Sequence, residues 1–247
     1  MIYSSIIEKL KSGKLFALLI DPDKHDRESI VEIGKSADTK TVDFILVGGS
    51  LVSGSVDETV SLLKDSTQLP VILFPGNVLQ ISPSADAILF LSLISGRNPE
   101  FLIGNHVIAA PVLRKTNLEI IPTGYILIEN GRTTSVEYMS NTKPIPSDKI
   151  DLAVATAIAG EMLGHKLIYL EAGSGAKENI NASMIREVRS HISIPLIVGG
   201  GIHTPAQIRE TYQAGADIII IGSAIEKGQV ALLSLLDSVR DIKQNTG

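Results

Sequence analysis

The sequence predicts a single α/β domain with the (β/α)8 fold of a TIM barrel, modified in its third unit. Three observations predict it. The chain has 247 residues, a size typical of one such barrel; eight short apolar runs alternate with helical segments; and the last two runs both end in glycine-rich turns. Most runs are continuously apolar, as expected for parallel strands that are buried on both faces. No linker or shift in composition divides residues 1–247 into a second domain.

Aliphatic and β-branched runs mark the expected strands, and segments with a helical period mark the expected helices. The strands are expected at residues 15–20, 43–47, 71–74, 87–93, 119–122 or on to 128, 167–170, 196–198 and 217–221. The helices are expected at residues 1–10, 28–36, 56–65, 99–109, 148–163, 183–189, 205–214 and 229–243. Pro205 suits the first turn of its helix, after Thr204 as a candidate N-cap. This alternation fits either a closed barrel or an open, doubly wound sheet.

Two segments depart from the regular alternation. Residues 76–86 contain Pro83 and no helical period, so the third helix is expected to be missing or replaced by an extended segment. Residues 129–147 form a long irregular connection that contains Gly131 and Pro144. Long loops at the C-terminal face of a barrel are often functional.

Composition excludes several classes of function. A net charge of −5 argues against a nucleic-acid partner, which would need a basic surface. Cysteine is absent and the five histidines show no zinc-site spacing, so neither a disulfide, a thiol nucleophile nor a zinc site is expected. The N-terminal segment is amphipathic and unlike a signal peptide, and no apolar run approaches about 18 residues. A cytoplasmic location is therefore expected.

Two glycine-rich strand ends near the C-terminus point to a phosphate ester as ligand. Residues 197–202 and 218–224 each run from an apolar strand into small residues before a helical segment. Bare backbone N–H groups at such ends bind anions, and the last two units of a barrel often form a phosphate cup. The alternative is that the glycines only allow strand and helix to pack closely.

Two carboxylates stand at strand ends, where barrel enzymes carry their chemistry. Asp21 is expected to project into the mouth of the barrel, where a carboxylate beside a phosphorylated substrate suits Mg2+. The alternative is that Asp21 caps a helix or pairs with Lys24. Asp23 is expected to cap the following helix. Glu171 could orient or deprotonate a hydroxyl, or could be a structural carboxylate under the glycine turn that follows it.

The residues that are missing from strand ends narrow the reaction class. Lys166 lies at the start of its strand, the wrong end for a Schiff-base lysine, so a class I aldolase is not expected. The fifth strand carries no aspartate to pair with Asp21, which argues against an amino-sugar phosphate isomerase that uses two acids. No pair of histidines at strand ends suggests a metal-dependent epimerase. One metal carboxylate, one further acid and a phosphate cup favour a transferase with a diphosphate leaving group.

Six motifs together resemble the geranylgeranylglyceryl phosphate synthase family, which also contains heptaprenylglyceryl phosphate synthases. In chain order they are Ile20-Asp21-Pro22-Asp23-Lys24, Val47-Gly48-Gly49-Ser50, Leu73-Phe74-Pro75-Gly76-Asn77, Tyr169-Leu170-Glu171-Ala172-Gly173-Ser174-Gly175-Ala176, Val198-Gly199-Gly200-Gly201-Ile202 and Ile221-Gly222-Ser223. The resemblance covers essentially the whole chain. The family's modified barrel, in which the third helix is replaced, agrees with the irregular segment noted above.

The resemblance implies a prenyltransferase that joins the sn-3 hydroxyl of sn-glycerol 1-phosphate to a polyprenyl diphosphate. It implies that Asp21 and Ser50 hold Mg2+ with the diphosphate, and that Glu171 binds the glycerol hydroxyls and helps to accept the proton. Residues 78–81 and 88–94 would line an apolar groove for the prenyl chain, in keeping with a mean hydropathy of +0.25. The glycerol phosphate would lie on Tyr169, Leu170, Glu171, Ala172, Gly173, Ser174, Gly175, Gly200, Gly201, Gly222 and Ser223.

The chain lacks the Lys-Leu-Asp start of the heptaprenyl enzymes of Gram-positive bacteria, because Leu19-Ile20-Asp21 stands there. It resembles instead the archaeal-type and related bacterial branch, which implies a geranylgeranyl donor and a homo-oligomer, either a dimer or a hexamer. A lipid product implies contact with a membrane surface. Two other readings remain open: a phosphosugar isomerase or thiamine-phosphate-synthase-like barrel with a polar mouth, and a non-enzymatic phosphate sensor.

Overall fold

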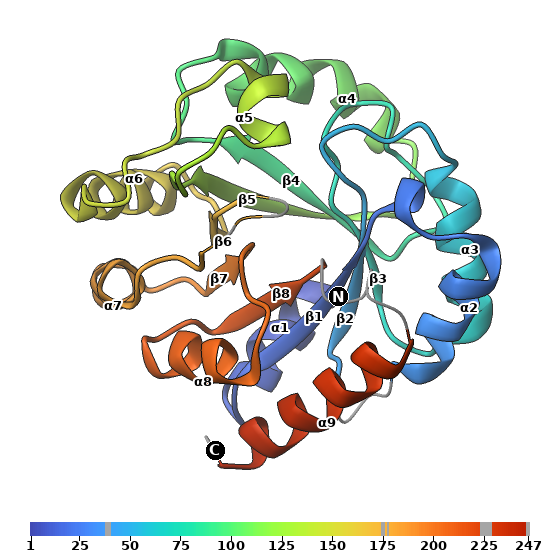
Figure 1. Cartoon of the computed structure of the whole chain (residues 1–247). Coiled ribbons are helices and arrows are strands. Elements are labelled where there is room, and N and C mark those ends of the chain that lie inside the picture. The colour runs from blue at the N-terminus through green and yellow to red at the C-terminus, as the bar shows by residue number, and fades with distance from the viewer. Residues whose placement is uncertain (38–40, 174–175, 177, 223–228, 246–247) are drawn as a thin grey trace.

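The computed structural model describes residues 1–37, 41–173, 176, 178–222 and 229–245. Eight parallel strands pair in chain order, and the last closes against the first, so the fold is a closed barrel rather than an open sheet (Figure 1). The strands are β1 (Leu15–Ile20), β2 (Phe44–Val47), β3 (Val71–Leu73), β4 (Ala87–Leu93), β5 (Glu119–Leu127), β6 (Leu167–Glu171), β7 (Leu196–Gly199) and β8 (Ile218–Ile221). The predicted TIM barrel is confirmed.

Most of the helices surround the barrel, whereas the N-terminal helix lies behind it in Figure 1, across the end at which the strands begin, which is the lower end of the barrel. The helices are α1 (Ile2–Leu10), η1 (Pro22–Lys24), α2 (Arg27–Ser36), α3 (Val56–Ser66), η2 (Glu100–Gly104), α4 (Asn105–Leu113), α5 (Ser135–Ser140), α6 (Ile150–Met162), α7 (Ala182–His191), α8 (Pro205–Gln213) and α9 (Gln229–Asn245). Thr204 caps α8 as predicted, in a capping box with Gln207. The prediction that Asp23 caps α2 was wrong, because Asp26 is the N-cap. Asp23 instead accepts the backbone N–H groups of Ser53 and Gly54, in the loop after β2.

No helix forms between β3 and β4, where residues 74–86 are all described, as the sequence predicts. Polar side chains hold this extended segment in place of a helical hydrogen-bond ladder. Ser82 and Ser84 donate to Asp57 at the start of α3. Asp86 accepts the backbone N–H of Val71 at 2.8 Å and pairs with a lysine of α3. The segment is thus tied to the barrel although it has no secondary structure.

The structure decides two expectations around β5. The strand runs to Leu127, so the longer of its two expected lengths holds. Pro122 does not end the strand, because pairing with β4 and β6 continues beyond it. The long connection after β5 is not wholly irregular, because it contains α5, which Thr134 caps.

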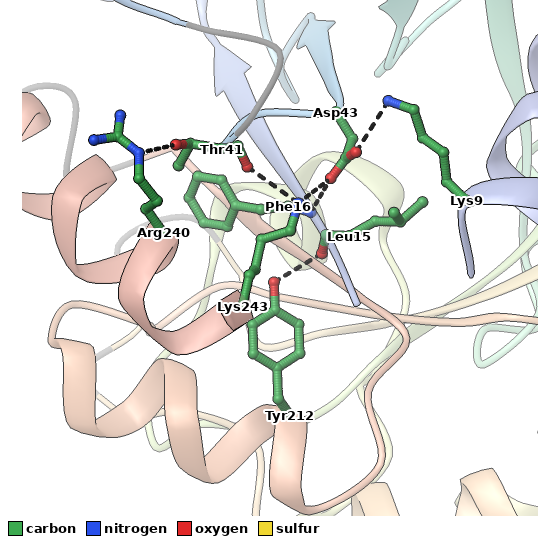
Figure 2. Close-up of polar contacts among 8 residues, drawn as sticks. All are labelled: Lys9, Leu15, Phe16, Thr41, Asp43, Tyr212, Arg240 and Lys243. Carbon is green, nitrogen blue, oxygen red and sulfur yellow. Dashed lines mark hydrogen bonds and ion pairs between the residues drawn. The ribbon is translucent and has the colours of Figure 1, made fainter. Parts of the chain in front are cut away.

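Two layers of apolar side chains form the core. One fills the barrel and includes Ile6 of α1, which closes the lower end; the other lies between the strands and the helices. At that lower end Asp43 is almost buried between Lys9 of α1 and Lys243 of α9, at 3.0 and 2.7 Å (Figure 2). Asp43 also accepts the backbone N–H of Phe16. Ion pairs therefore attach both terminal helices to this end of the barrel. The C-terminal ends of the strands lie at the opposite end.

Candidate active site

The C-terminal ends of the strands surround a polar cavity, the mouth of the barrel. Seven of the predicted site residues meet there, although they come from five different strand ends. Its lining includes Leu19, Asp21, Asp23, Lys24, Gly48, Gly49, Ser50, Leu51, Phe74, Tyr125, Ser135, Val136, Tyr169, Glu171, Gly200, Gly201, Ile202, Ile220, Ile221 and Gly222.

Glu171 ends β6 and is only 5% exposed, yet it borders the mouth. Its Oε1 accepts the backbone N–H of Gly173 at 2.6 Å. Burial raises the pKa of Glu171, and hydrogen bonds from Tyr169, the Gly173 N–H and Tyr125 partly offset this rise. A buried carboxylate with a raised pKa accepts a proton more readily than an exposed one.

Tyr125 and Tyr169 stand beside this carboxylate as hydrogen-bond donors. Burial, and then the negative charge of Glu171, raise the pKa of both phenols well above 10, so both keep their protons. Their rings pack edge to face at 5.2 Å, and each also contacts Phe74. The sequence did not predict this aromatic cluster of Phe74, Tyr125 and Tyr169, because the cluster depends on contacts between strands that are distant in the chain.

The glycines after β7 bring backbone close to the carboxylate. Gly200 and Gly201 have φ values of 77° and 69°, which favour glycine. A side chain on Gly200 would begin 2.3 Å from Glu171 Oε1, and one on Gly199 would overlap the Tyr169 hydroxyl. Only glycine therefore allows the β7 turn to lie against β6 and the loop that follows it, which is a different contact from the strand–helix packing weighed in the sequence. The same turn also lines the mouth with backbone.

Asp21 lies across the mouth, at the end of β1. Its Oδ1 accepts the backbone N–H of Asp23, so it caps η1, and its Oδ2 lies 4.0 Å from Lys24. Both alternatives weighed for Asp21 are thus present, and they leave it bordering the mouth. Gly49 leaves room beside it, because a side chain there would begin 3.0 Å from Asp21 Oδ2. Ser50 follows directly and lines the same cavity.

The remaining predicted residues differ in what they can present to a ligand. Leu170 and Ala172 are buried in the outer layer, between the strands and the helices, so only their backbones could face a ligand. The N–H of Gly173 is occupied by Glu171. Ser174, Gly175 and Ser223 lie outside the described residues.

An apolar groove opens from the mouth and runs between the helix-less segment and α4. It shares Gly49, Ser50, Phe74, Tyr125 and Val136 with the mouth. As the sequence predicted, residues from 78–81 and 88–94 line it, namely Val78, Ile81, Ile88, Phe90, Leu91 and Leu93. The inner face of α4 and part of α5 were missed; they supply Asn105, His106, Ala109, Leu113, Met139 and Ser140.

The described residues contain no group of three or more histidine or acidic side chains placed to hold a metal ion. Among the same residues, no helix is both long and apolar enough to cross a bilayer. Any divalent ion in the mouth would therefore share its coordination with a bound substrate and water.

Structural similarity extends to proteins of low sequence identity. Thiamine phosphate pyrophosphorylase from Pyrococcus furiosus superposes with a TM-score of 0.57 at 14% identity, over 96% of this chain and 98% of that one. This likeness shows the barrel fold alone.

Closer relatives match over nearly the full chain. Geranylgeranylglyceryl phosphate synthase of Chitinophaga pinensis is 50% identical over 240 residues, 96% of this chain and 95% of that protein. The crystal structure of (S)-3-O-geranylgeranylglyceryl phosphate synthase from Thermoplasma acidophilum, in complex with sn-glycerol-1-phosphate, superposes with a TM-score of 0.93 at 34% identity and covers 99% of both chains. The model of the PcrB family matches residues 7–241. The chain belongs to the PcrB family.

Proposed function

We propose that this protein is a prenyltransferase that joins the sn-3 hydroxyl of sn-glycerol 1-phosphate to geranylgeranyl diphosphate and releases diphosphate. One observation carries the proposal: a polar mouth with a buried carboxylate opens directly into an apolar groove, and the two share a rim. A phosphorylated polar acceptor and a long apolar donor need these two environments side by side. The names of the close relatives support the same reaction.

The acceptor would bind on the β6, β7 and β8 side of the mouth. Backbone at Gly200, Gly201 and Gly222 lines that side and suits the phosphate. Glu171 and Tyr169 lie beside it and would hold the glycerol hydroxyls. The roles of Ser174, Gly175 and Ser223 in this cup, and of the backbone at Leu170, Ala172 and Gly173, remain predictions.

The donor diphosphate would bind at Asp21 and Ser50, together with Mg2+. One carboxylate and one hydroxyl, with room left by Gly49, fit an ion that completes its shell with phosphate oxygens and water. When bound, Mg2+ neutralises negative charge on the diphosphate. The prenyl chain would then extend from the shared rim into the groove.

The protein's own residues would orient the reaction. The acceptor oxygen forms a bond to C1 of the prenyl group, and the bond from C1 to the diphosphate oxygen breaks with its electron pair on the diphosphate. Glu171 holds the attacking hydroxyl and accepts its proton, for which its raised pKa suits it. Fixing acceptor and donor on opposite sides of one mouth accounts for much of the acceleration expected.

A phosphosugar isomerase or thiamine-phosphate-synthase-like enzyme is the alternative. Such an enzyme would have a polar mouth and no use for a lipid groove. The twenty-one residues that line the groove here are mostly apolar, which favours the prenyltransferase. A non-enzymatic sensor would not need both carboxylates at the mouth.

A radiolabelled transfer assay tests the proposal. We expect purified protein with sn-glycerol 1-phosphate, Mg2+ and prenyl diphosphates from C10 to C35 to form a solvent-extractable ether phosphate, most rapidly with the C20 donor. Absence of product with every donor, from folded protein, would contradict the prenyltransferase and favour the phosphosugar barrels.

Two variants test the assigned roles by calorimetric titration. Asp21→Ala should lose Mg2+-dependent binding of the donor, and Glu171→Ala should mainly weaken binding of glycerol phosphate. Asp26→Ala is a matched control, because this acid is near in sequence but only caps α2. The reverse pattern would overturn the assignment of donor and acceptor sides. Light scattering and a vesicle flotation assay would test the expected homo-oligomer and membrane contact.

A further inference from the structure

The loops after β2 and β3 run backbone against backbone along the shared rim of mouth and groove. A side chain on Gly48 would overlap the carbonyl oxygen of Phe74, and one on Gly76 would overlap the carbonyl oxygen of Gly49. Glycine is therefore required in both loops for this close approach. The regular backbone pairing reaches only to the start of these loops, where the N–H of Phe74 donates to the carbonyl oxygen of Val47 at 2.8 Å.

Gln80, from the helix-less segment, supplies hydrogen bonds to both loops. Its Oε1 accepts the N–H of Gly76 at 3.1 Å and the N–H of Gly49 at 3.3 Å, and its Nε2 donates to the carbonyl oxygen of Gly49 at 2.8 Å. The side chain is only 2% exposed. An uncharged amide is well suited to this task, since it both donates and accepts at one position.

The segment that carries Gln80 is itself anchored. Two residues on, Ser82 is fully buried and donates to Asp57 of α3. On the other side, Val78 and Ile81 face the groove. The backbone of Gln80 is thus held in place between the wall of the groove and the two loops.

We propose that Gln80 is a positioning residue for the prenyl diphosphate, acting through the backbone of Gly49 and Gly76. The inference rests on the proposed function, because it takes the Gly49–Ser50 corner as the diphosphate site. By fixing Gly49, Gln80 fixes Ser50 and the space beside Asp21 Oδ2 before the donor arrives. Gln80 itself lines neither the mouth nor the groove.

Gln80→Met tests this role, since it keeps the length of the side chain and removes all three hydrogen bonds. We expect kcat/KM for the prenyl diphosphate to fall by about tenfold or more, because a small displacement of binding groups is costly in rate. The KM for glycerol phosphate should stay within about twofold of the original, because its cup belongs to β6, β7 and β8. A general loss of packing would affect both substrates.

Gln68→Met is the matched control, because Gln68 is exposed and lies before β3, at the opposite end of the barrel from Gln80. It should leave both substrates unaffected. Thermal melts of both variants show whether each is folded at the assay temperature.

Gln80→Glu adds a readout that a merely structural role would not give. The ionised carboxylate can still accept from the two N–H groups but presents an oxygen to the carbonyl of Gly49; the protonated form can donate there as the amide does. Burial raises the pKa of a carboxyl, so protonation is attainable in mildly acidic solution. We expect donor affinity, relative to the unchanged protein, to recover at about pH 6 and to fall at about pH 8.

Equal changes in the KM of both substrates, or no change for the donor, would overturn the proposal. If the unchanged protein forms no ether product, the proposed function fails separately, and calorimetry with inorganic diphosphate and Mg2+ decides on Gln80. Weaker diphosphate binding by Gln80→Met than by the unchanged protein would support the positioning role. Equal binding, or no binding by either protein, would refute it.

Discussion

Gly200→Ala should displace the carboxylate of Glu171, and its effect on the rate of transfer can be compared with its effect on the free energy of unfolding. Gly200 has a φ of 77°, in the left-handed region, and its missing side chain faces Glu171. An alanine there meets two penalties. The backbone strain costs about 1–2 kcal/mol, and the new carbon would stand 2.3 Å from Glu171 Oε1, where contacts below 3.0 Å are not tolerated.

Relief of that contact requires the carboxylate to move by at least about 0.7 Å. A misplacement near 1 Å can cost about a hundredfold in rate. We therefore expect kcat/KM of the transfer reaction to fall between about tenfold and a hundredfold. The Gly173 N–H, which now binds Glu171, lies 2.9 Å from the same added carbon and adds to the disturbance.

Gly164→Ala is the control, because Gly164 has a φ of 92° and nothing within 4 Å of an added carbon. Both variants should lose about 1–2 kcal/mol of unfolding free energy in urea titrations from backbone strain, and Gly200→Ala should lose more because of its contact with Glu171. Only Gly200→Ala should lose activity in the transfer assay. Full activity in Gly200→Ala, or an equal loss in Gly164→Ala, would refute the reasoning that contact with Glu171 makes this glycine necessary.

Three further predictions concern charge and stability. Asp43→Ala leaves Lys243 without its buried partner (Figure 2) and should cost about 3–5 kcal/mol in urea unfolding; a loss below about 1 kcal/mol would contradict this. Tyr212→Phe removes a 2.8 Å hydrogen bond to the Leu15 carbonyl and should cost about 1 kcal/mol in the same assay. Burial raises the pKa of Glu171 in the folded state, so the folded protein binds this proton more tightly than the unfolded chain, and the resulting stabilisation is lost as pH rises through the folded pKa. Glu171→Gln should therefore be inactive yet gain stability relative to the original protein as the pH rises above about 4.3, the ordinary pKa of a glutamate, and no relative gain would contradict the raised pKa.

The fold could be read from the sequence wherever the chain's local pattern decides its structure. Continuous apolar runs such as β8 gave strands within a residue or two of their true ends. The position of Asp21 and Glu171 at the mouth could be predicted because the C-terminal ends of all strands meet there in a barrel. The sequence left the length of β5 open, and the structure shows that the missing N–H of Pro122 is tolerated within that strand.

What the sequence could not supply depends on contacts between distant residues. Both faces of α4 are apolar, so its periodicity does not tell which residues, such as Ala109 and Leu113, turn toward the groove. Gln80 lies in a segment without period, and nothing local distinguishes it from an exposed glutamine. Its importance appears only when the loops after β2 and β3 are seen side by side.

The shared rim explains how one barrel can serve two dissimilar substrates. Phe74 and Tyr125 line both the mouth and the groove, and Tyr169 packs against them from the mouth. The same rings thus offer apolar surface to a prenyl chain, while the two phenols donate hydrogen bonds to Glu171. A prenyl chain that lies along this cluster would place its first carbon at the polar mouth, beside Glu171 and the hydroxyl of the bound acceptor. In the proposed reaction, the aromatic cluster would therefore couple binding of the donor to the position of Glu171 as proton acceptor, without a separate domain for either substrate.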